Sequence, residues 1–290
     1  MKQSNLANRF APLDDALQDA LNQAVSLALA EDVGACDYTG LLVPAETRVQ
    51  AHVRVRENAV LCGAPWFEAV MWALDTSITI DWRYSEGAMM QADDIVCLIE
   101  APARVLLTAE RCALNFLQLL SGVATATRSY VDLIAGFDAS ILDTRKTLPG
   151  LRLAQKYAVR VGGGKNQRLA LYDGILIKEN HIAAAGGIAQ AMAAAHALHS
   201  GVSIQIEVEN LEQLQQALNA GAVSILLDNF SLPVMREAVL HTQRRAILEA
   251  SGGINKDSVQ AIAQTGVDRI SIGSLTKDVR ATDYSLRIVG

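Results

Sequence analysis

Apolar residues recur with two different periods in the first third of the chain. From residue 13 to residue 31 they follow the i, i+3, i+4 spacing of an amphipathic helix, and Asp14 and Asp15 suit the positive end of its dipole. Residues 48–55 alternate polar and apolar side chains instead, which predicts a half-buried strand. Further strands are expected over 59–62, 77–82 and 95–100, with a helix over 63–74. Strands covered by one or two helices predict a small α+β layered domain.

The second half of the chain alternates strands with helices. It begins with a long helix predicted over 108–135, which stops at Gly136. Strands are then expected at 141–143, 174–178, 203–209, 224–228, 246–251 and 269–274, with helices such as 211–220 and 257–265 between the later ones. This rhythm predicts a parallel sheet, either a closed barrel or an open doubly wound sheet. No GxGxxG motif follows a strand, and nearly every strand ends in a functional side chain, so a barrel is favoured.

Composition narrows the class of protein. The 290 residues are 51% hydrophobic and 19% charged, which is globular composition with enough apolar residues for a large core. No Pro/Gly-rich linker divides the chain, so we place one domain over residues 1–109 and a second, packed against it, over 110–290. No apolar run could span a bilayer, the N-terminus lacks a signal-peptide pattern, and the four cysteines are widely spaced. We expect a cytoplasmic protein with reduced cysteines.

Positive charge is concentrated in residues 143–182, although the net charge of the chain is −6. The basic residues there are Arg145, Lys146, Arg152, Lys156, Arg160, Lys165, Arg168 and Lys178, and a run of three glycines, 162–164, lies among them. A nucleic-acid or membrane surface would spread its basic residues over the whole domain. The cluster therefore predicts a site for a multiply anionic small molecule, with no nucleic-acid or membrane partner.

Cations and carboxylates at the strand ends are the candidate site. Its basic half consists of Arg145, Lys146, Arg168 and Lys178. Cations gathered in this way repel one another unless an anionic ligand or an acidic partner compensates them, and Glu207 and Asp228 at two strand ends are the obvious partners. These two carboxylates could also hold Mg²⁺ through a phosphate-bearing substrate. The simpler alternative is a salt-bridge network at the rim of the barrel.

Glycines follow the last two predicted strands. The segments 250–255 (ASGGIN) and 272–277 (IGSLTK) place bare backbone N–H groups, each followed by a helical turn, where an anion could bind. Barrels often bind phosphate in the loops after their last two strands, which favours a phosphate site here. Ordinary strand-to-helix turns are the alternative.

Eight motifs resemble one known family in both order and spacing. They are ERCALNFLQLLSGVAT from residue 110, DTRKTLPGLR, GGGKNQR, LIKENHI, IEVEN, LLDNF, SGGI and ISIGSLTK, and the family is quinolinate phosphoribosyltransferase, the carboxylating nicotinate-nucleotide pyrophosphorylase. The resemblance covers nearly the whole chain and is weakest before about residue 28. It implies an N-terminal open-faced α+β sandwich and an incomplete α/β barrel of the seven-stranded type, with a C-terminal segment that packs back on the N-terminal domain. It also implies a homodimer, or a larger assembly, in which the sandwich domain of one subunit covers the barrel mouth of the other.

The reaction that the resemblance implies joins two anionic substrates. The ring nitrogen of quinolinate attacks C1 of 5-phosphoribosyl-1-pyrophosphate, pyrophosphate leaves with Mg²⁺, and decarboxylation gives nicotinate mononucleotide for de novo NAD biosynthesis. Arg145, Arg168 and Lys178 should grip the two carboxylates of quinolinate, and Arg111 should reach into the site of the neighbouring subunit. Preorganised charge is expected to be the main catalytic factor.

The resemblance assigns the phosphoribosyl donor to a different set of residues. Lys146 should contact this donor, while Glu207 and Asp228 should hold ribose hydroxyls or Mg²⁺ beside C1. We expect Lys146, Lys178, Glu207 and Asp228 to be the catalytic residues. The 5-phosphate should lie in a cradle formed by Ser251, Gly252, Gly253 and Gly273, with Lys277 close by.

Gln167 departs from the family pattern, which usually has a histidine before the arginine of GGGxNxR. Glutamine donates hydrogen bonds but carries no charge and does not titrate, so we expect Gln167 to bind a substrate carboxylate with a flatter pH dependence near neutrality. The neighbouring Lys165 could supply the missing charge.

Three other functions are compatible with parts of the pattern. A paralogous transferase of the type found beside molybdenum-transport genes would share the fold, but a substrate with one carboxylate would not need so many cations. An aldolase-type barrel would use Lys178 as a Schiff-base nucleophile, which requires a desolvated amine. A catalytically silent phosphate-binding or scaffold protein would have no need for Glu207 and Asp228 beside the cations.

Overall fold

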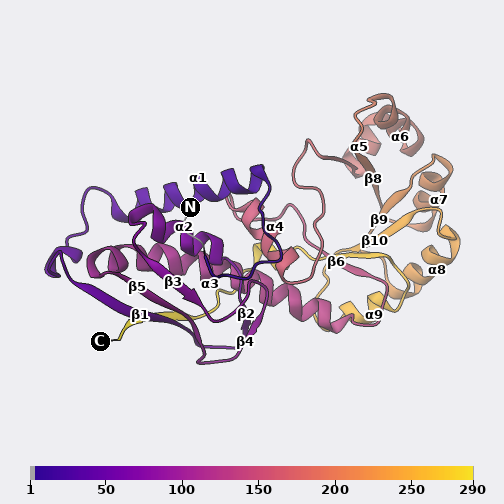
Figure 1. Cartoon of the computed structure of the whole chain (residues 1–290). Helices are drawn as coiled ribbons and strands as arrows, with labels where there is room; N and C mark the ends of the chain where they lie inside the picture. Colours follow the sequence, from indigo (N-terminus) through magenta and orange to yellow (C-terminus); the bar gives the residue numbers. More distant parts are fainter. Residues whose placement is uncertain (1–3, 290) are drawn as a thin grey trace. The chain divides into compact units, whose positions relative to one another are not determined.

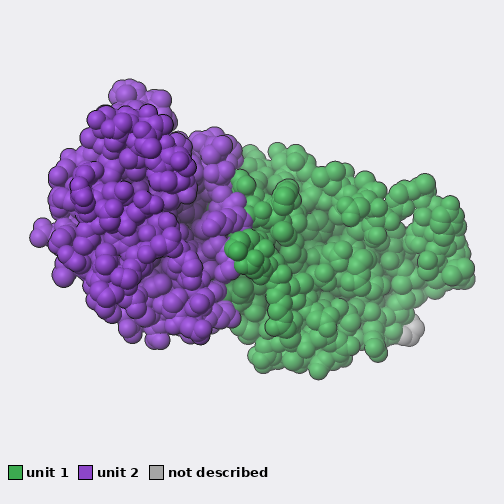
Figure 2. Space-filling view, turned by 180° about the vertical axis from the view of Figure 1, so that it is seen from behind, with its two compact units in different colours: residues 1–128, 147–163, 276–290 green, residues 129–146, 164–275 purple. Residues whose placement is uncertain are grey.

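The computed structural model describes residues 4–289, which form two compact units (Figure 2). Unit 1 comprises the described parts of 1–128, 147–163 and 276–290, and unit 2 comprises 129–146 and 164–275. The predicted boundary at residue 109 falls inside one long helix, α3 (Ala103–Leu133), so a change of sequence pattern and the division into units do not coincide. The chain crosses between the units four times, and sequence patterning does not reveal such crossings.

Unit 1 is built on a four-stranded antiparallel sheet with the order β12-β1-β5-β3. Its strands are β1 (Arg48–Val55), β3 (Thr79–Trp82), β5 (Ile95–Pro102) and the C-terminal β12 (Tyr284–Ile288). Strands β2 (Ala59–Val60) and β4 (Met89–Met90) form a separate two-stranded antiparallel sheet. A short 3-10 helix, η1 (Gly40–Leu42), precedes β1. The alternation in residues 48–55 is confirmed, since Ala51, Val53 and Val55 are buried and their neighbours are more exposed.

Helices cover one side of this sheet, drawn uppermost in Figure 1. They include α1 (Asp15–Val33), α2 (Ala64–Leu74) and the first part of α3, and their apolar side chains form one core with the strands. Helix α1 begins where the pattern predicts, because the Asp14 carboxylate accepts a hydrogen bond from the Leu17 backbone N–H at 2.9 Å. An α+β layer over the N-terminal region is therefore confirmed.

The carboxyl group of Glu86 is buried in unit 1. Glu86 is 3% exposed and accepts hydrogen bonds from the Gly63 N–H at 2.8 Å, the Ala64 N–H at 3.3 Å and the Tyr157 hydroxyl at 3.0 Å. Burial raises its pKa to about 7 despite these three donors. Glu86 therefore holds the start of α2 against Tyr157, which lies on α4 (Arg152–Val161).

Helix α4 and the first two glycines of the run that follows it belong to unit 1. Lys156 on this helix is 1% exposed, so part of the basic stretch is structural. A Cβ at Gly162 would lie 2.5 Å from the Ala124 carbonyl oxygen of α3, and the Arg128 side chain donates to the Gly162 carbonyl at 3.0 Å. Gly162 is thus a close-packing position between two helices, which leaves the chain free to enter unit 2 at Gly164.

Unit 2 contains a six-stranded parallel sheet with the order β6-β11-β10-β9-β8-β7. The strands are β6 (Ser140–Leu142), β7 (Gly174–Ile177), β8 (Ser203–Val208), β9 (Ser224–Asp228), β10 (Ile247–Ser251) and β11 (Arg269–Ser271). The helices of this region are α5 (Glu179–Ala185), α6 (Ile188–Ala197), α7 (Leu211–Asn219), α8 (Leu232–Thr242), α9 (Val259–Ala263) and α10 (Ser274–Lys277). Helices α6, α7 and α8 lie on the outer side of the sheet (Figure 1). The prediction of an incomplete α/β barrel is confirmed.

The sheet has six regular strands, one fewer than the seven-stranded type. Beyond β6, a single parallel bridge joins Leu142 to Lys165, and the Lys165 N–H donates to the Ile141 carbonyl at 2.8 Å. The segment that leads to Gln167 and Arg168 therefore runs beside β6 without becoming a strand. Within residues 4–289, no helix is long and apolar enough to cross a membrane.

Candidate active site

A cavity of about 370 Å³ lies at the carboxyl ends of the unit 2 strands, and we call it the carboxyl-end pocket. Its lining residues are Thr144, Arg145, Lys146, Gln167, Arg168, Leu176, Lys178, Glu207, Leu226, Asp228, Glu249, Ser251 and Ser271. All of them belong to unit 2. The four cations and two carboxylates that the sequence singles out thus line one cavity, at the end of the sheet where barrel enzymes hold their catalytic groups.

Arg145 follows β6 and is held partly inside the protein. Its Nε atom is buried and has no hydrogen-bond partner among residues 4–289. A buried guanidinium nitrogen without an acceptor is costly, so the arrangement suits an anion that enters the pocket. Lys146 lies next to it, and a Cβ at Gly273 would be 3.1 Å from the Lys146 Cδ atom, so Lys146 lies close to the turn at Gly273.

Asp143 fixes the second cationic segment although it does not line the pocket. It is fully buried at the end of β6 and accepts hydrogen bonds from the Gln167 N–H at 2.9 Å and the Asn166 side chain at 2.5 Å. Arg168 follows, and its guanidinium donates to the Gly174 carbonyl at 2.8 Å. Burial, and then the charge of Arg145, lower the pKa of Arg168. Two guanidinium groups thus lie close enough to repel each other, and an anion between them would relieve that repulsion.

Gln167 takes part in a hydrogen-bond network at the floor of the pocket. Its side-chain N–H groups donate to Gln205 Oε1 at 2.6 Å and to Glu249 Oε1 at 3.4 Å, and its own oxygen accepts the Arg168 N–H at 2.5 Å. Gln205 donates to Glu249 Oε2 at 2.9 Å, and the Ser271 hydroxyl donates to the same fully buried carboxylate. The Gln167 amide is therefore anchored to protein groups, and the expected bond to a substrate carboxylate stays a prediction.

The residues of this hydrogen-bond network could be only partly predicted from the sequence. Gln205 and Glu207 share one face of β8, as the alternation of a strand requires, whereas Glu249 is the middle residue of β10. Nothing in the sequence links Gln205, Glu249 and Ser271 to Gln167, because they come from three different strands and one irregular segment. We add them to the candidate site as residues that shape it.

Lys178 and Glu207 are an oppositely charged pair in the lining of the pocket. Their side chains make an ion pair at 3.0 Å between the ends of β7 and β8, with Lys178 45% exposed and Glu207 11% exposed. His181 accepts the Lys178 N–H through Nδ1 at 3.0 Å, so its ring caps α5. Asp228 stands opposite Ser251 in the β9–β10 register. We call the four cations the basic sector of the pocket and Glu207 with Asp228 its acidic sector, and the two sectors meet at the Lys178–Glu207 ion pair.

The predicted phosphate cradle is assembled in part. Ser251 lines the pocket, and Gly252 and Gly253 follow it with φ of 108° and 58°, in the left-handed region that glycine favours. Helix α9 begins only at Val259, so no helix N-terminus follows these glycines directly. Gly273 immediately precedes α10. The glycine positions agree with an anion site, while the expected dipole is limited to the single turn of α10.

Two predicted site residues belong to unit 1. Arg111 is exposed on α3, and Lys277 pairs with its neighbour Asp278 at 3.1 Å. Their roles at the site stay predictions.

The donor atoms for a metal ion are few. Among residues 4–289 no group of three or more His, Cys, Asp or Glu side chains is arranged to hold a metal. Glu207 and Asp228 nevertheless line one pocket and offer the hard oxygen ligands that Mg²⁺ prefers. Mg²⁺ in phosphate chemistry takes only one or two protein carboxylates, so this donor set fits an ion carried by a phosphorylated substrate.

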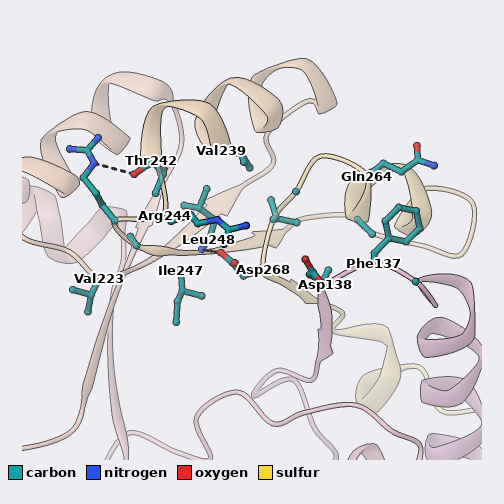
Figure 3. Close-up of a pocket in the computed structure, with 17 residues that line it drawn as sticks. Phe137, Asp138, Val223, Val239, Thr242, Arg244, Ile247, Leu248, Gln264 and Asp268 are labelled. Atoms are coloured by element: carbon teal, nitrogen blue, oxygen red, sulfur yellow. Dashed lines mark hydrogen bonds between the residues drawn. The ribbon is translucent and has the colours of Figure 1, made fainter.

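A larger cavity, of about 710 Å³, lies at the opposite end of the same sheet, and we call it the amino-end cavity (Figure 3). It is bordered by residues that precede β6, β9, β10 and β11. Its polar groups serve the backbone: Asp268 accepts the Leu248 N–H at 2.7 Å, and Arg245 donates to the carbonyls of Thr242 at 3.1 Å and His241 at 2.7 Å. The cavity is larger but lacks a comparable cluster of cations.

Comparisons with known proteins match most of the chain. The family model for the quinolinate phosphoribosyl transferase C-terminal domain matches residues 123–287, and the model for the N-terminal domain matches residues 37–121. The chain is 41% identical over 284 residues to a nicotinate-nucleotide pyrophosphorylase (carboxylating) of Mycobacterium leprae (strain TN), covering 94% of this chain and 99% of the relative. A probable enzyme of the same name from Bacillus subtilis (strain 168) is 39% identical over 259 residues, covering 89% and 90%. The solved nicotinate-nucleotide pyrophosphorylase from Francisella tularensis has a TM-score of 0.91 at 45% identity, covering 93% of this chain and 96% of that one.

Proposed function

The chain belongs to the quinolinate phosphoribosyltransferase family, and we propose that it transfers phosphoribosyl from 5-phosphoribosyl-1-pyrophosphate to quinolinate with loss of CO₂. The products are nicotinate mononucleotide and pyrophosphate, and the pathway is de novo NAD biosynthesis. One observation supports this most directly. Four cations and the carboxylates of Glu207, Asp228 and Glu249 line a single pocket of about 370 Å³ at the carboxyl ends of the strands.

The basic sector suits the dicarboxylate. Arg145 and Arg168 offer planar guanidinium groups, each able to take a carboxylate through two parallel hydrogen bonds, and Lys178 adds a compact charge. Arg145 Nε, buried and without a partner among the described residues, gains an acceptor when such a substrate enters. The grip also places the substrate ring nitrogen, which promotes reaction by proximity.

The acidic sector suits the phosphoribosyl donor. As the bond from C1 to pyrophosphate breaks, positive charge develops on the ribosyl group, and Glu207 and Asp228 stabilise that charge. Glu207 and Asp228 would hold Mg²⁺, and a bound ion would supply positive charge to the pyrophosphate leaving group. Lys146 contacts the donor, and the backbone of residues 251–253 and Gly273 receives its 5-phosphate.

Loss of CO₂ needs charge stabilisation as well. The carbon that loses CO₂ retains the electron pair of the broken bond next to the positively charged ring nitrogen, and a proton from water then completes the product. Fixed cations close to that carbon lower the energy of this state, and they need no reorganisation when the bond breaks. No covalent nucleophile is required. The geometry of Lys178 also disfavours a Schiff base, because its amine is ion-paired and 45% exposed instead of desolvated.

The proposal includes the assembly and its location. We propose a homodimer, able to associate further, in which Arg111 of one subunit completes the site of the other. Arg111 is exposed on α3, as an interface residue is in a single chain. We also place the enzyme in the cytoplasm, since all four cysteines are free.

A turnover assay with quinolinate, phosphoribosyl pyrophosphate and Mg²⁺ tests the activity. Pyrophosphate and CO₂ should be released in equal amounts. Nicotinate serves as the control substrate, because it lacks the second carboxylate and should not turn over. Efficient turnover of nicotinate, or pyrophosphate release without CO₂, would exclude the proposed reaction.

A further inference from the structure

The residue after β9 has an unusual backbone conformation. Asn229 has φ of 55°, in the left-handed region that few residues other than glycine adopt. Its N–H donates to the Ser251 carbonyl at 2.9 Å, so the end of β9 is joined to the end of β10. Asparagine tolerates this conformation better than most side chains, which accounts for the residue type but not for the absence of glycine.

The Asn229 side chain touches both halves of the donor site. Its amide nitrogen donates to Asp228 Oδ2 at 2.9 Å. Its amide oxygen lies against Gly252, where a Cβ would overlap it. Gly252 also has φ of 108°, so two independent constraints require glycine there. Asn229 itself is exposed and does not line the carboxyl-end pocket.

We propose that Asn229 is a positioning residue that sets the Asp228 carboxylate relative to the turn at residues 251–253. This inference rests on the proposed function, in which Asp228 faces the ribose and C1 while the turn receives the 5-phosphate. One oxygen of Asp228 is held by the amide, which leaves Oδ1 to face the ligand. The oxygen of the same amide packs against Gly252 in the turn at residues 251–253. A single side chain therefore fixes the separation between two ends of one substrate.

Two variants separate these contacts. Asn229→Gly keeps the left-handed backbone but removes both side-chain contacts. Asn229→Asp keeps an oxygen against Gly252 but replaces the N–H donor with a second carboxylate beside Asp228. Gln243→Gly is the matched control, because Gln243 is another exposed non-glycine residue with φ of 50°, at the end of α8.

The expected effect is selective for one substrate. Both Asn229 variants should raise the KM for phosphoribosyl pyrophosphate by about tenfold, since a hydrogen bond to a charged group is lost, and should leave the KM for quinolinate within about twofold. Gln243→Gly should leave both constants unchanged. An unchanged KM for the donor, or an equal rise for both substrates, overturns the inference. If Asn229→Gly does not fold, Asn229→Asp provides the same readout.

A double-mutant cycle tests the contact with Gly252. Gly252→Ala should lose more donor affinity in the wild-type background than in Asn229→Gly, because the atom that its Cβ meets is then gone. Equal losses in both backgrounds contradict the proposed contact. Calorimetric binding of phosphoribosyl pyrophosphate with Mg²⁺ distinguishes this from failure of the proposed function. If the wild type binds the donor without turning over quinolinate, the function is wrong, and the Asn229 variants still test positioning.

Discussion

The two ends of the unit 2 sheet are both hollow, yet they differ in chemistry. The amino-end cavity is about 710 Å³ and the carboxyl-end pocket about 370 Å³. In the larger one, Asp268 and Arg245 satisfy backbone groups that begin β10 and end α8. In the smaller one, four cations and three carboxylates line the pocket, and the Arg145 Nε atom has no hydrogen-bond partner among residues 4–289. The volume of a cavity therefore does not identify the site. The site is identified by charged side chains that line the cavity and are not used to hydrogen-bond the backbone.

The physical cause of this difference is the direction of the strands. All six strands are parallel, so every carboxyl end opens on the same side. The loops that follow them can carry any side chain, because the sheet is already complete before they begin. The loops at the amino ends instead return from helices and are occupied with ending those helices. Stability and function are thus divided between the two ends.

The largest expected effect compares one arginine from each end. Arg145→Gln should reduce kcat/KM for quinolinate by about 10²- to 10³-fold, because a preorganised cation is lost from the pocket. Arg244→Gln, at the amino-end cavity, should leave kcat/KM within twofold, or about 0.4 kcal/mol. Steady-state kinetics with thermal unfolding as a folding control checks both. A large loss in Arg244→Gln would mean that the amino end takes part in function.

The next effect asks whether the pocket is completed by a second subunit. Arg111→Ala and Lys178→Ala should each be nearly inactive alone. Mixed in equal amounts, they should recover roughly a quarter of wild-type activity, since half of the dimers are hybrids and one of their two sites is intact. Activity after subunit exchange, with hybrids verified by differently tagged chains, is the measurement. No recovery in verified hybrids would rule out shared sites.

Gln167→His should have a moderate and pH-dependent effect. An imidazole at this position would lie beside the buried Glu249 carboxylate, which favours the protonated ring. Quinolinate affinity in the variant should fall as pH rises from about 6 to 8, because the added positive charge is lost, while the wild type changes less. Titrations at several pH values, with Gln167→Asn as a non-titrating control, would show the difference. Identical pH profiles would contradict it.

The smallest effect on activity is expected from Glu86, which belongs to unit 1 and lines neither cavity of the unit 2 sheet. The folded pKa of Glu86 is raised by burial to about 7 from 4.5, so the native state binds the proton more tightly than the unfolded chain. The free energy of unfolding should therefore fall as pH rises between these values, by about 3 kcal/mol in total. Glu86→Gln should flatten that slope and leave KM for both substrates unchanged. Denaturant unfolding at pH 4.5 to 8 is the check, and an unchanged slope would show that Glu86 does not titrate as described.

Much of the fold could be predicted because its elements are locally encoded. Residues 48–55 alternate, and the strand has those bounds; the expected helix over 63–74 is α2 at Ala64–Leu74. The six strands of unit 2 appear where apolar runs stand between helical segments. The hydrophobic pattern did not predict β12 as a strand, because its pairing with β1 joins residues more than 200 positions apart; only the resemblance implied that the C-terminal segment packs back on the N-terminal domain. The sequence pattern also did not show that α4 belongs to unit 1 while the segments before and after it belong to unit 2, since membership of a unit depends on contacts between residues far apart in the sequence.

The residue types of the site were encoded in the sequence, and their arrangement was decided by tertiary structure. A concentration of Arg and Lys, acids at strand ends and glycines after them are chemical facts of the chain, and they predict an anion-binding enzyme. Three details of the site could be seen only in the folded structure. The Gln167 amide is hydrogen-bonded to the buried Glu249, and Arg145 Nε has no acceptor among residues 4–289. The Asn229 amide donates to Asp228, and its oxygen lies against Gly252. The reason is physical. Side-chain chemistry is a local property, whereas the satisfaction of a buried polar group depends on which other strand lies within about 3 Å of it.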